Sequence, residues 1–255
     1  MRGRVIAMLL IAAIVAGGCA SAPARIAVGS RVVYVGDYDT GDLSQWATLQ
    51  ARDWSQFAGG YCTYSACVRD DGPDHSTAAR YEVRDGDIPP FGGGVRSEVR
   101  TGDGPSAGGY VLEGDERWYQ LSVKFDESFR NPRNSTAGWF IVMQWFGYGA
   151  PAVSLQVSES NELEFGGDGV PRTYHRKIAP VKPGVWVDYV LHIKFSKDPK
   201  VGFAEAWVDG LLTVPRYTRP TMTTDTSYLK QGIYRDVHSK GTQVVWHDGL
   251  RVTAP

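Results

Sequence analysis

The sequence of 255 residues predicts an all-β protein, a jelly-roll sandwich of two antiparallel sheets. Short stretches in which apolar and polar residues alternate follow one another along most of the chain, as half-buried strands do. Apolar residues almost never recur with the period of a helix, and the 30 glycines and 14 prolines suit frequent turns. A curved sheet of this kind offers a concave groove wide enough for a polymer.

Composition fits one globular domain, which we expect over residues 31–255. With 42% hydrophobic and 22% charged residues, the chain can bury one large core. A β-sandwich of this size can form a single domain rather than two. The formal net charge of −1 argues against nucleic acid as a partner, because such binding depends on clustered positive charge. Local basic clusters can still bind an anionic ligand, and we expect a monomer.

The N-terminus is typical of an exported protein. Two arginines precede an apolar run over residues 5–15, which is too short to span a bilayer as a stable helix. The stretch AGGC that ends at Cys19 resembles a bacterial lipobox. We therefore expect a signal peptide over residues 1–18, a lipidated Cys19, and a tether over residues 19–30. Ala20, the residue after the cysteine, favours retention in the outer membrane. The protein would contact that membrane only through the lipid on Cys19. The alternative is ordinary cleavage beside an incidental cysteine.

The other two cysteines, Cys62 and Cys67, are expected to form a disulfide, because disulfides persist in exported proteins. The short loop between them means that the bond would stiffen a local turn rather than cross-link the core. Free thiols are an alternative. A metal site is a weaker one, since no His or Cys partners stand at zinc spacing.

A turn-rich segment near the start of the domain carries three aspartates, Asp37, Asp39 and Asp42, and ends at Trp46, which we expect in the core. The EF-hand pattern with its distal glutamate is absent. Solvated turn aspartates are therefore the favoured interpretation. A structural calcium site is the alternative, and no other metal or organic cofactor is expected.

About a dozen stretches are expected to be strands, and none reads as a helix. Residues 139–146 are nearly all apolar, which predicts a central strand covered on both faces. The expected strands cover residues 32–35, 79–84, 95–101, 119–125, 139–146, 153–157, 162–165, 186–195, 204–208, 212–215, 229–234 and 243–252.

Three of these strands would each place polar side chains on one face, because successive side chains of a strand alternate. Gly232 would leave open space on its face, and Arg235 would point to the opposite side. If the strands lie side by side, their polar faces form a groove. A salt-bridge ladder or a solvated face is the alternative. The polar faces comprise Arg96, Glu98 and Arg100 on one strand, Gln144 on the next, and Tyr228, Lys230 and Tyr234 on the last.

The same three stretches carry a family resemblance. In order, residues 96–100 (RSEVR), 142–146 (VMQWF) and 228–234 (YLKQGIY) resemble the signature strands of the alginate lyases of polysaccharide lyase family seven. The wider chain is similar to the type I heparin lyase and glucuronan lyase group. This second similarity runs through residues 36–46 (GDYDTGDLSQW), 186–189 (WVDY) and 229–235 (LKQGIYR).

The resemblance implies β-elimination on a uronic-acid polysaccharide, within a concanavalin-like jelly roll and without a redox or organic cofactor. It assigns Tyr234 as base and acid, with Arg96 and Gln144 neutralising the substrate carboxylate. Nearby positive charge would have to lower the pKa of the phenol. The implied substrate-binding residues are Arg100, Lys230, Tyr228, Glu98 and Arg235, and Glu98 would orient the arginines.

One position departs from the pattern, because Phe146 stands where the alginate lyases have histidine. Three interpretations follow: Tyr234 serves alone, another histidine substitutes, or catalysis is lost. His192 is the candidate substitute, since it alternates with apolar neighbours and would face groove or solvent. His75 and His238 lie in loops that could reach the groove, and His175 and His247 read as surface residues.

Two other function classes remain open. A non-catalytic carbohydrate-binding lipoprotein would explain Phe146. A glycoside hydrolase would need paired carboxylates, and although Glu162 and Glu164 share a strand face, the spacing Glu-x-Asp-x-x-Glu is absent.

Overall fold

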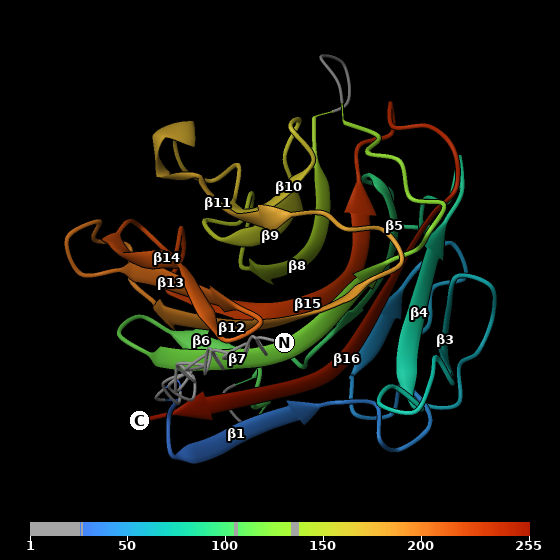
Figure 1. Cartoon of the computed structure of the whole chain (residues 1–255), viewed down its shortest axis with the longest axis horizontal. Coiled ribbons are helices and arrows are strands. Elements are labelled where there is room, and N and C mark those ends of the chain that lie inside the picture. The colour runs from blue at the N-terminus through green and yellow to red at the C-terminus, as the bar shows by residue number, and fades with distance from the viewer. Residues whose placement is uncertain (1–25, 27, 105–106, 134–137) are drawn as a thin grey trace, which may run out of the picture.

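We describe a computed structural model of the chain over residues 26, 28–104, 107–133 and 138–255. The expected lipidation site at Cys19 and the signal peptide lie outside these residues. Two sheets of eight strands each pack face to face (Figure 1). Within the described ranges, one short 3₁₀ turn, Arg172–Tyr174, is the only helical element, and no helix is long and apolar enough to cross a membrane. The all-β sandwich is confirmed.

The first sheet has the strand order β14-β13-β12-β7-β16-β4-β3, with β1 paired to β16. All its neighbouring strands are antiparallel. Its strands are β1 (Arg31–Gly36), β3 (Ala66–Arg69), β4 (Ala78–Val83), β7 (Glu116–Phe125), β12 (Trp186–Lys194), β13 (Phe203–Val208), β14 (Leu211–Thr218) and β16 (Gln243–Ala254).

The second sheet has the order β11-β10-β9-β8-β15-β5-β2, with β6 paired to β15, and is also antiparallel. Figure 1 shows β8 and β15 strongly curved. The strands are β2 (Thr48–Gln50), β5 (Val95–Arg100), β6 (Tyr110–Leu112), β8 (Phe140–Phe146), β9 (Ser154–Val157), β10 (Glu162–Gly166), β11 (Arg176–Pro180) and β15 (Thr226–Arg235).

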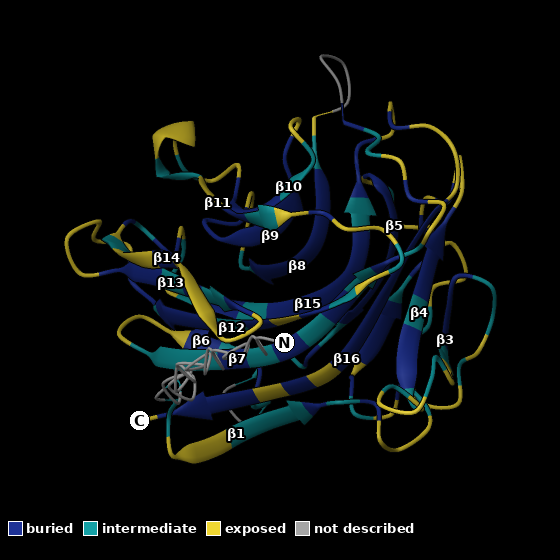
Figure 2. Ribbon diagram, in the orientation of Figure 1, coloured by how far each residue is buried: buried dark blue, intermediate teal, exposed yellow. Residues whose placement is uncertain are grey.

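The core lies between the sheets and is rich in aromatic side chains. Trp145 on β8 is buried and meets Tyr119 on β7 edge to face, with ring centroids 4.8 Å apart. Trp46 is 3% exposed and belongs to the same core, as expected. Figure 2 shows that the strands are mostly buried and that exposed residues gather in loops and at sheet edges.

The expected strands all occur, and β2, β3, β6 and β11 were missed. The missed strands have three to five residues, too few to show a period of two. The disulfide between Cys62 and Cys67 is confirmed and closes the turn before β3.

The three aspartates before Trp46 act as hydrogen-bond acceptors, and Asp39 accepts from Thr77 of another loop. Asp37 accepts from the backbone of Asp39 and from Gln45, and Asp42 accepts from the backbone of Ser44. Searched over the described residues, His, Cys, Asp and Glu form no group of three or more that could hold a metal ion.

Candidate active site

The three polar strand faces meet in the second sheet, because β15 lies between β5 and β8. Lys230 pairs with Arg100 on one side and with Gln144 on the other. Tyr234 pairs in the same way with Arg96 and Ile141. The alternation read from the sequence therefore does bring these residues to one surface.

Glu98 is the hub of this surface. One carboxylate oxygen accepts a hydrogen bond from Gln144 Nε2 at 2.5 Å, and the other accepts from Lys230 Nζ at 2.7 Å. Arg96 Nη1 lies 3.6 Å from the second oxygen. All four residues are buried, so the carboxylate is held by two hydrogen bonds and one ion pair and is not free to meet a substrate. Glu98 thus holds Gln144 and Lys230 and pairs with Arg96, whereas Arg100 pairs with Asp103 instead.

Gly232 is needed for a close approach of strands rather than for open space. A Cβ there would lie 2.2 Å from the Ser97 carbonyl oxygen and 2.8 Å from Glu98 Cα, and its φ of +136° suits only glycine. The pairing register of β15 with β8 shifts between Gln231 and Tyr234, as at a bulge. Gly232 thus lets β5 bring Glu98 against β15, and the expectation of a gap was wrong.

Tyr234 stands at the end of this network, packed under a guanidinium group. Arg96 Cζ lies 4.0 Å from the centroid of the phenol ring, and the ring of Trp139 lies 5.6 Å from it. Burial raises the pKa of Tyr234 above its usual value, against the opposing charge of Arg96. The phenol therefore keeps its proton in the free protein, opposite to the lowered pKa expected from the sequence.

Lys230 is more deeply enclosed than a substrate-binding lysine needs to be. Its side chain is 3% exposed, and burial lowers its pKa although Glu98 opposes the shift. Its Nζ atom lies 5.3 Å from the Phe146 ring and 5.9 Å from the Tyr234 ring. Lys230 therefore supplies positive charge beneath the surface.

Two small pockets open beside these residues. One, of about 270 Å³, is lined by Tyr234, Trp139, Ile141, Gln144 and Phe146, among others. Gln144 Oε1 is buried without a hydrogen-bond partner within the described residues, and one N–H of its amide remains after the bond to Glu98.

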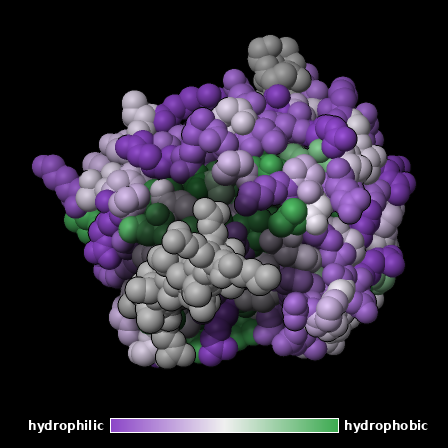
Figure 3. Space-filling view, viewed as in Figure 1, coloured by the Kyte–Doolittle hydropathy of each residue, from purple (hydrophilic) through white to green (hydrophobic). Residues whose placement is uncertain are grey.

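The second pocket, of about 330 Å³, includes Tyr228 and Tyr148. Arg100 lies 5.0 Å from the centroid of the Tyr228 ring and forms an ion pair with Asp103. Burial raises the pKa of Tyr228, against the opposing charge of Arg100. In Figure 3, apolar surface gathers toward the middle of this view and is surrounded by hydrophilic residues.

Two expected site residues lie elsewhere. Arg235 is fully buried on the opposite face of β15 and forms an ion pair with Asp85 at 3.0 Å. His192 lies on β12 of the first sheet, with its ring stacked on Trp118 at 3.9 Å. Neither side chain reaches the site, because Arg235 lies on the opposite face of β15 and His192 lies on a strand of the other sheet.

The remaining histidines do not supply a substitute for Phe146. His75 pairs with Asp248 and stacks on Trp186 of the first sheet, and His238 bonds to Asp236 in the loop after β15. No histidine is among the described residues that line the pocket beside Tyr234.

His247 is fully buried in the core, so its expected surface position was wrong. Its Nε2 lies 3.4 Å from the Gly232 carbonyl oxygen. Its place in the alternation, two residues after the buried Val245 on β16, was the available signal.

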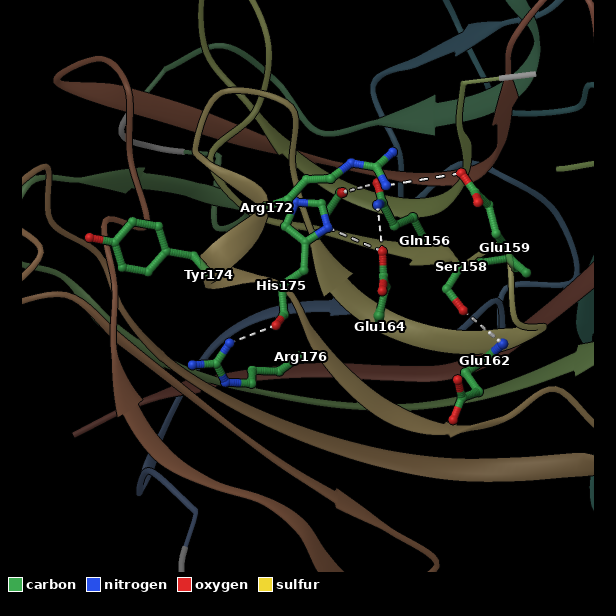
Figure 4. Close-up of polar contacts among 12 residues, drawn as sticks. Gln156, Ser158, Glu159, Glu162, Glu164, Arg172, Tyr174, His175 and Arg176 are labelled. Carbon is green, nitrogen blue, oxygen red and sulfur yellow. Dashed lines mark hydrogen bonds and ion pairs between the residues drawn. The ribbon is translucent and has the colours of Figure 1, made fainter. Parts of the chain in front are cut away.

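A second polar cluster, which the sequence did not predict, lies toward β11 (Figure 4). Glu164 Oε1 accepts from Gln156 Nε2 at 2.9 Å and faces His175 Nδ1 at 3.2 Å. Burial opposes ionisation of Glu164, but the bonds from His175 and Gln156 outweigh it and lower its pKa. A hydrogen bond from Lys177 lowers the pKa of Glu162. Neither is the raised-pKa acid that a glycoside hydrolase requires.

Comparison with known proteins places these features in context. The sequence matches the family model described as "Polysaccharide lyase" over residues 38–251. A search of the curated proteins found no match.

Several solved structures share the fold. The structure of endo-β-1,4-glucuronan lyase from the fungus Trichoderma reesei is similar with a TM-score of 0.63, at 17% identity, over 88% of this chain and 96% of that chain. Family 7 alginate lyase A1-II′ is similar with a TM-score of 0.58, at 19% identity, over 85% and 96%. The catalytic domain of a glycoside hydrolase family 131 protein from Coprinopsis cinerea is similar with a TM-score of 0.57, at 15% identity, over 89% and 95%. Because lyases and a hydrolase share this fold, the fold alone does not set the reaction.

Proposed function

Given that the chain belongs to the polysaccharide lyase family, we propose that it cleaves a uronic-acid polysaccharide by β-elimination, with Tyr234 as the group that moves protons. The observation that carries this proposal is the phenol of Tyr234, which lies beneath the Arg96 guanidinium at 4.0 Å and lines a pocket with Gln144. The proton-transfer group and Gln144 thus line one pocket, and Arg96 lies directly against the phenol ring.

Arg96 and Gln144 would neutralise the uronate carboxylate. Loss of the C5 proton places further negative charge on this group, and N–H donors already in position stabilise it as it forms. Removing one such donor typically costs about 2.7–4 kcal/mol of barrier. One oxygen of Glu98 fixes Gln144, and the other holds positive charge from Lys230 next to this position.

The proton follows a short path in this mechanism. The Tyr234 phenolate takes the C5 proton, the electrons of the C5–H bond form the C4=C5 double bond, and the C4–O4 bond breaks. The phenol then gives its proton to the departing O4, so that Tyr234 returns to its starting state. Because the pKa of Tyr234 is raised in the free protein, the reactive phenolate is scarce at neutral pH.

A carbohydrate-binding protein without turnover is the second candidate. It is favoured by Phe146, which lines the pocket beside Tyr234 where the alginate lyases have a histidine. An apolar ring can stack on a sugar but can neither accept nor donate a proton.

The test is the ultraviolet absorbance of the conjugated double bond that elimination creates and hydrolysis does not. The domain without residues 1–19 is incubated with glucuronan, alginate, hyaluronan, heparin and pectate, and Tyr234→Phe is the control. We expect absorbance to rise with one polymer and to stay flat in the variant. Retained binding with no absorbance change would favour the second candidate.

The remaining expectations concern cellular context and cofactors. We infer an exported monomer that is lipidated at Cys19 and anchored in the outer membrane, and that works without metal or organic cofactor. Loss of fatty-acid labelling and release from membranes in Cys19→Ala test the anchor. Chelation of divalent cations should leave turnover unchanged.

A further inference from the structure

Three large aromatic side chains lie exposed at the β2 end of the second sheet. Trp54 and Phe57 come from the loop after β2 and are 42% and 79% exposed, and Phe91 precedes β5 and is 53% exposed. Together with Gln50 and Arg100 they line a hollow of about 520 Å³. Large apolar groups gathered in a hollow are typical of a ligand surface.

This hollow is adjacent to the candidate active site. Arg100 lines the hollow and lies opposite Lys230 in the strand pairing. Arg96 Cζ is 5.5 Å from the Phe91 ring and 4.0 Å from the Tyr234 ring, so one guanidinium group links the two. A polymer bound over Tyr234 that continued toward β2 would enter the hollow.

The aromatic loop is held in place without a ligand. Leu49 and Ser55 exchange backbone hydrogen bonds of 3.0 and 3.1 Å, which close the turn that carries Trp54. Ser55 Oγ donates to the Phe57 carbonyl oxygen at 2.6 Å. The Cys62–Cys67 disulfide closes the next turn. A preformed surface avoids the entropic cost of ordering a loop on binding.

Two residues that line the hollow also carry a polar atom without a partner among the described residues. Gln50 Oε1 and Arg100 Nε are buried and have no hydrogen-bond partner within the part of the chain described. A pyranose ring presents C–H faces that suit aromatic rings and hydroxyl groups at its edge that suit an amide and a guanidinium group. This combination fits a sugar better than an extended peptide, which needs an unpaired strand edge with backbone partners.

We propose that Trp54, Phe57 and Phe91 form a stacking platform that binds a pyranose ring of the polymer, next to the uronate that loses its C5 proton. The proposal rests on the proposed function for the identity of the polymer. The platform binds by contact of apolar faces, so its contribution persists at high salt, where attraction between the uronate and Arg100 is screened.

The experiment separates binding from turnover. In the Tyr234→Phe background, the affinity for glucuronan and alginate is measured by calorimetry at low and high salt for Trp54→Ala and Phe57→Ala. Trp207→Ala, on β13 of the first sheet, is the matched control. We expect each platform variant to bind about tenfold more weakly at both salt concentrations, and the control to bind as the background does. With Tyr234 intact, the same substitutions should raise KM and leave kcat close to its original value.

The outcomes distinguish the two proposals. Platform variants that bind as tightly as the Tyr234→Phe background would overturn the platform and leave the lyase proposal standing. Weaker binding by these variants in a protein that yields no unsaturated product would support the platform and overturn the reaction. No binding to either polymer would overturn the platform.

Discussion

The cluster around His192 on the first sheet and the cluster around Glu98 on the second both combine carboxylates, nitrogen donors and an aromatic ring, but of these two clusters only the second opens to a pocket. On the first sheet, His192 lies between Glu116 and Glu205, each with an oxygen 2.7 Å from a ring nitrogen, while Trp118 covers the ring. On the second sheet, Glu98 binds its donors beneath the surface, and the phenol of Tyr234 lines a pocket.

The difference lies in which groups have no partner left. Both ring nitrogens of His192 already lie within hydrogen-bond distance of a carboxylate, so the imidazole has no nitrogen left for a substrate. Gln144 keeps one N–H of its amide after the bond to Glu98, in a pocket that Tyr234 also lines. Similar residue types therefore form a closed structural cluster in one sheet and a candidate active site in the other.

The substitutions Tyr234→Phe and His192→Gln should show the largest difference between the two clusters, in their effect on kcat. We expect Tyr234→Phe to lower kcat by about 10²–10⁴-fold, because it removes the proton-transfer group. His192→Gln should leave kcat within about twofold, because His192 does not reach the pocket. Both are measured as product absorbance under saturating polymer. A large loss of kcat in folded His192→Gln would move the active site to the first sheet.

The substitutions Glu98→Ala and Glu116→Ala should also differ, in the unfolding free energy that each one costs. Removing Glu98 leaves the buried Lys230 ammonium without its ion-pair partner, which we expect to cost about 3–5 kcal/mol of stability. Removing Glu116 should cost about 1 kcal/mol, because His192 still bonds to Glu205 and the site is closer to water. Denaturant unfolding measures both, and equal losses would mean that Lys230 does not depend on Glu98.

The sequence predicted the residues of the candidate site better than it predicted the partner of Arg235, and the reason is physical. Alternation along β5, β8 and β15 shows which side chains of a strand share a face, and the family resemblance indicated that Arg96, Gln144 and Tyr234 belong to one site. Alternation does not show which carboxylate of a distant loop lies next to a strand residue. The ion pair between Arg235 and Asp85 could therefore not be predicted from the sequence.

Other features had weaker signals or none. Gly232 meets the backbone of β5, and the close approach of two strands has no local signature. The aromatic platform sits on loops without a period, where only the exposed Trp54 and Phe57 hint at binding.

Activity should depend on pH through Tyr234. Because its pKa is raised, the phenolate fraction grows about tenfold per pH unit below that pKa, and kcat/KM should rise about a hundredfold from pH 7 to pH 9. Lys230, whose pKa is lowered, loses its charge on the alkaline side and should end the rise. Initial rates across this range test the assignment. A kcat/KM that is flat above pH 7 would mean that another group takes the proton.

His247, in the core between the two sheets, should give the smallest of these effects, a change in how stability depends on pH. Burial lowers its pKa to about 3, whereas an unfolded histidine titrates near 6.5. Below about pH 6.5 the unfolded chain therefore binds a proton that the folded one refuses, and stability falls as pH falls toward 3. Between pH 7 and pH 4.5 this linkage amounts to about 2.5 kcal/mol. His247→Gln keeps an amide donor near the Gly232 carbonyl but cannot titrate, so its unfolding free energy should fall less over this range. If parent and variant lost stability in parallel, His247 would have to be protonated in the folded core, which its apolar surroundings and single long hydrogen bond of 3.4 Å do not support.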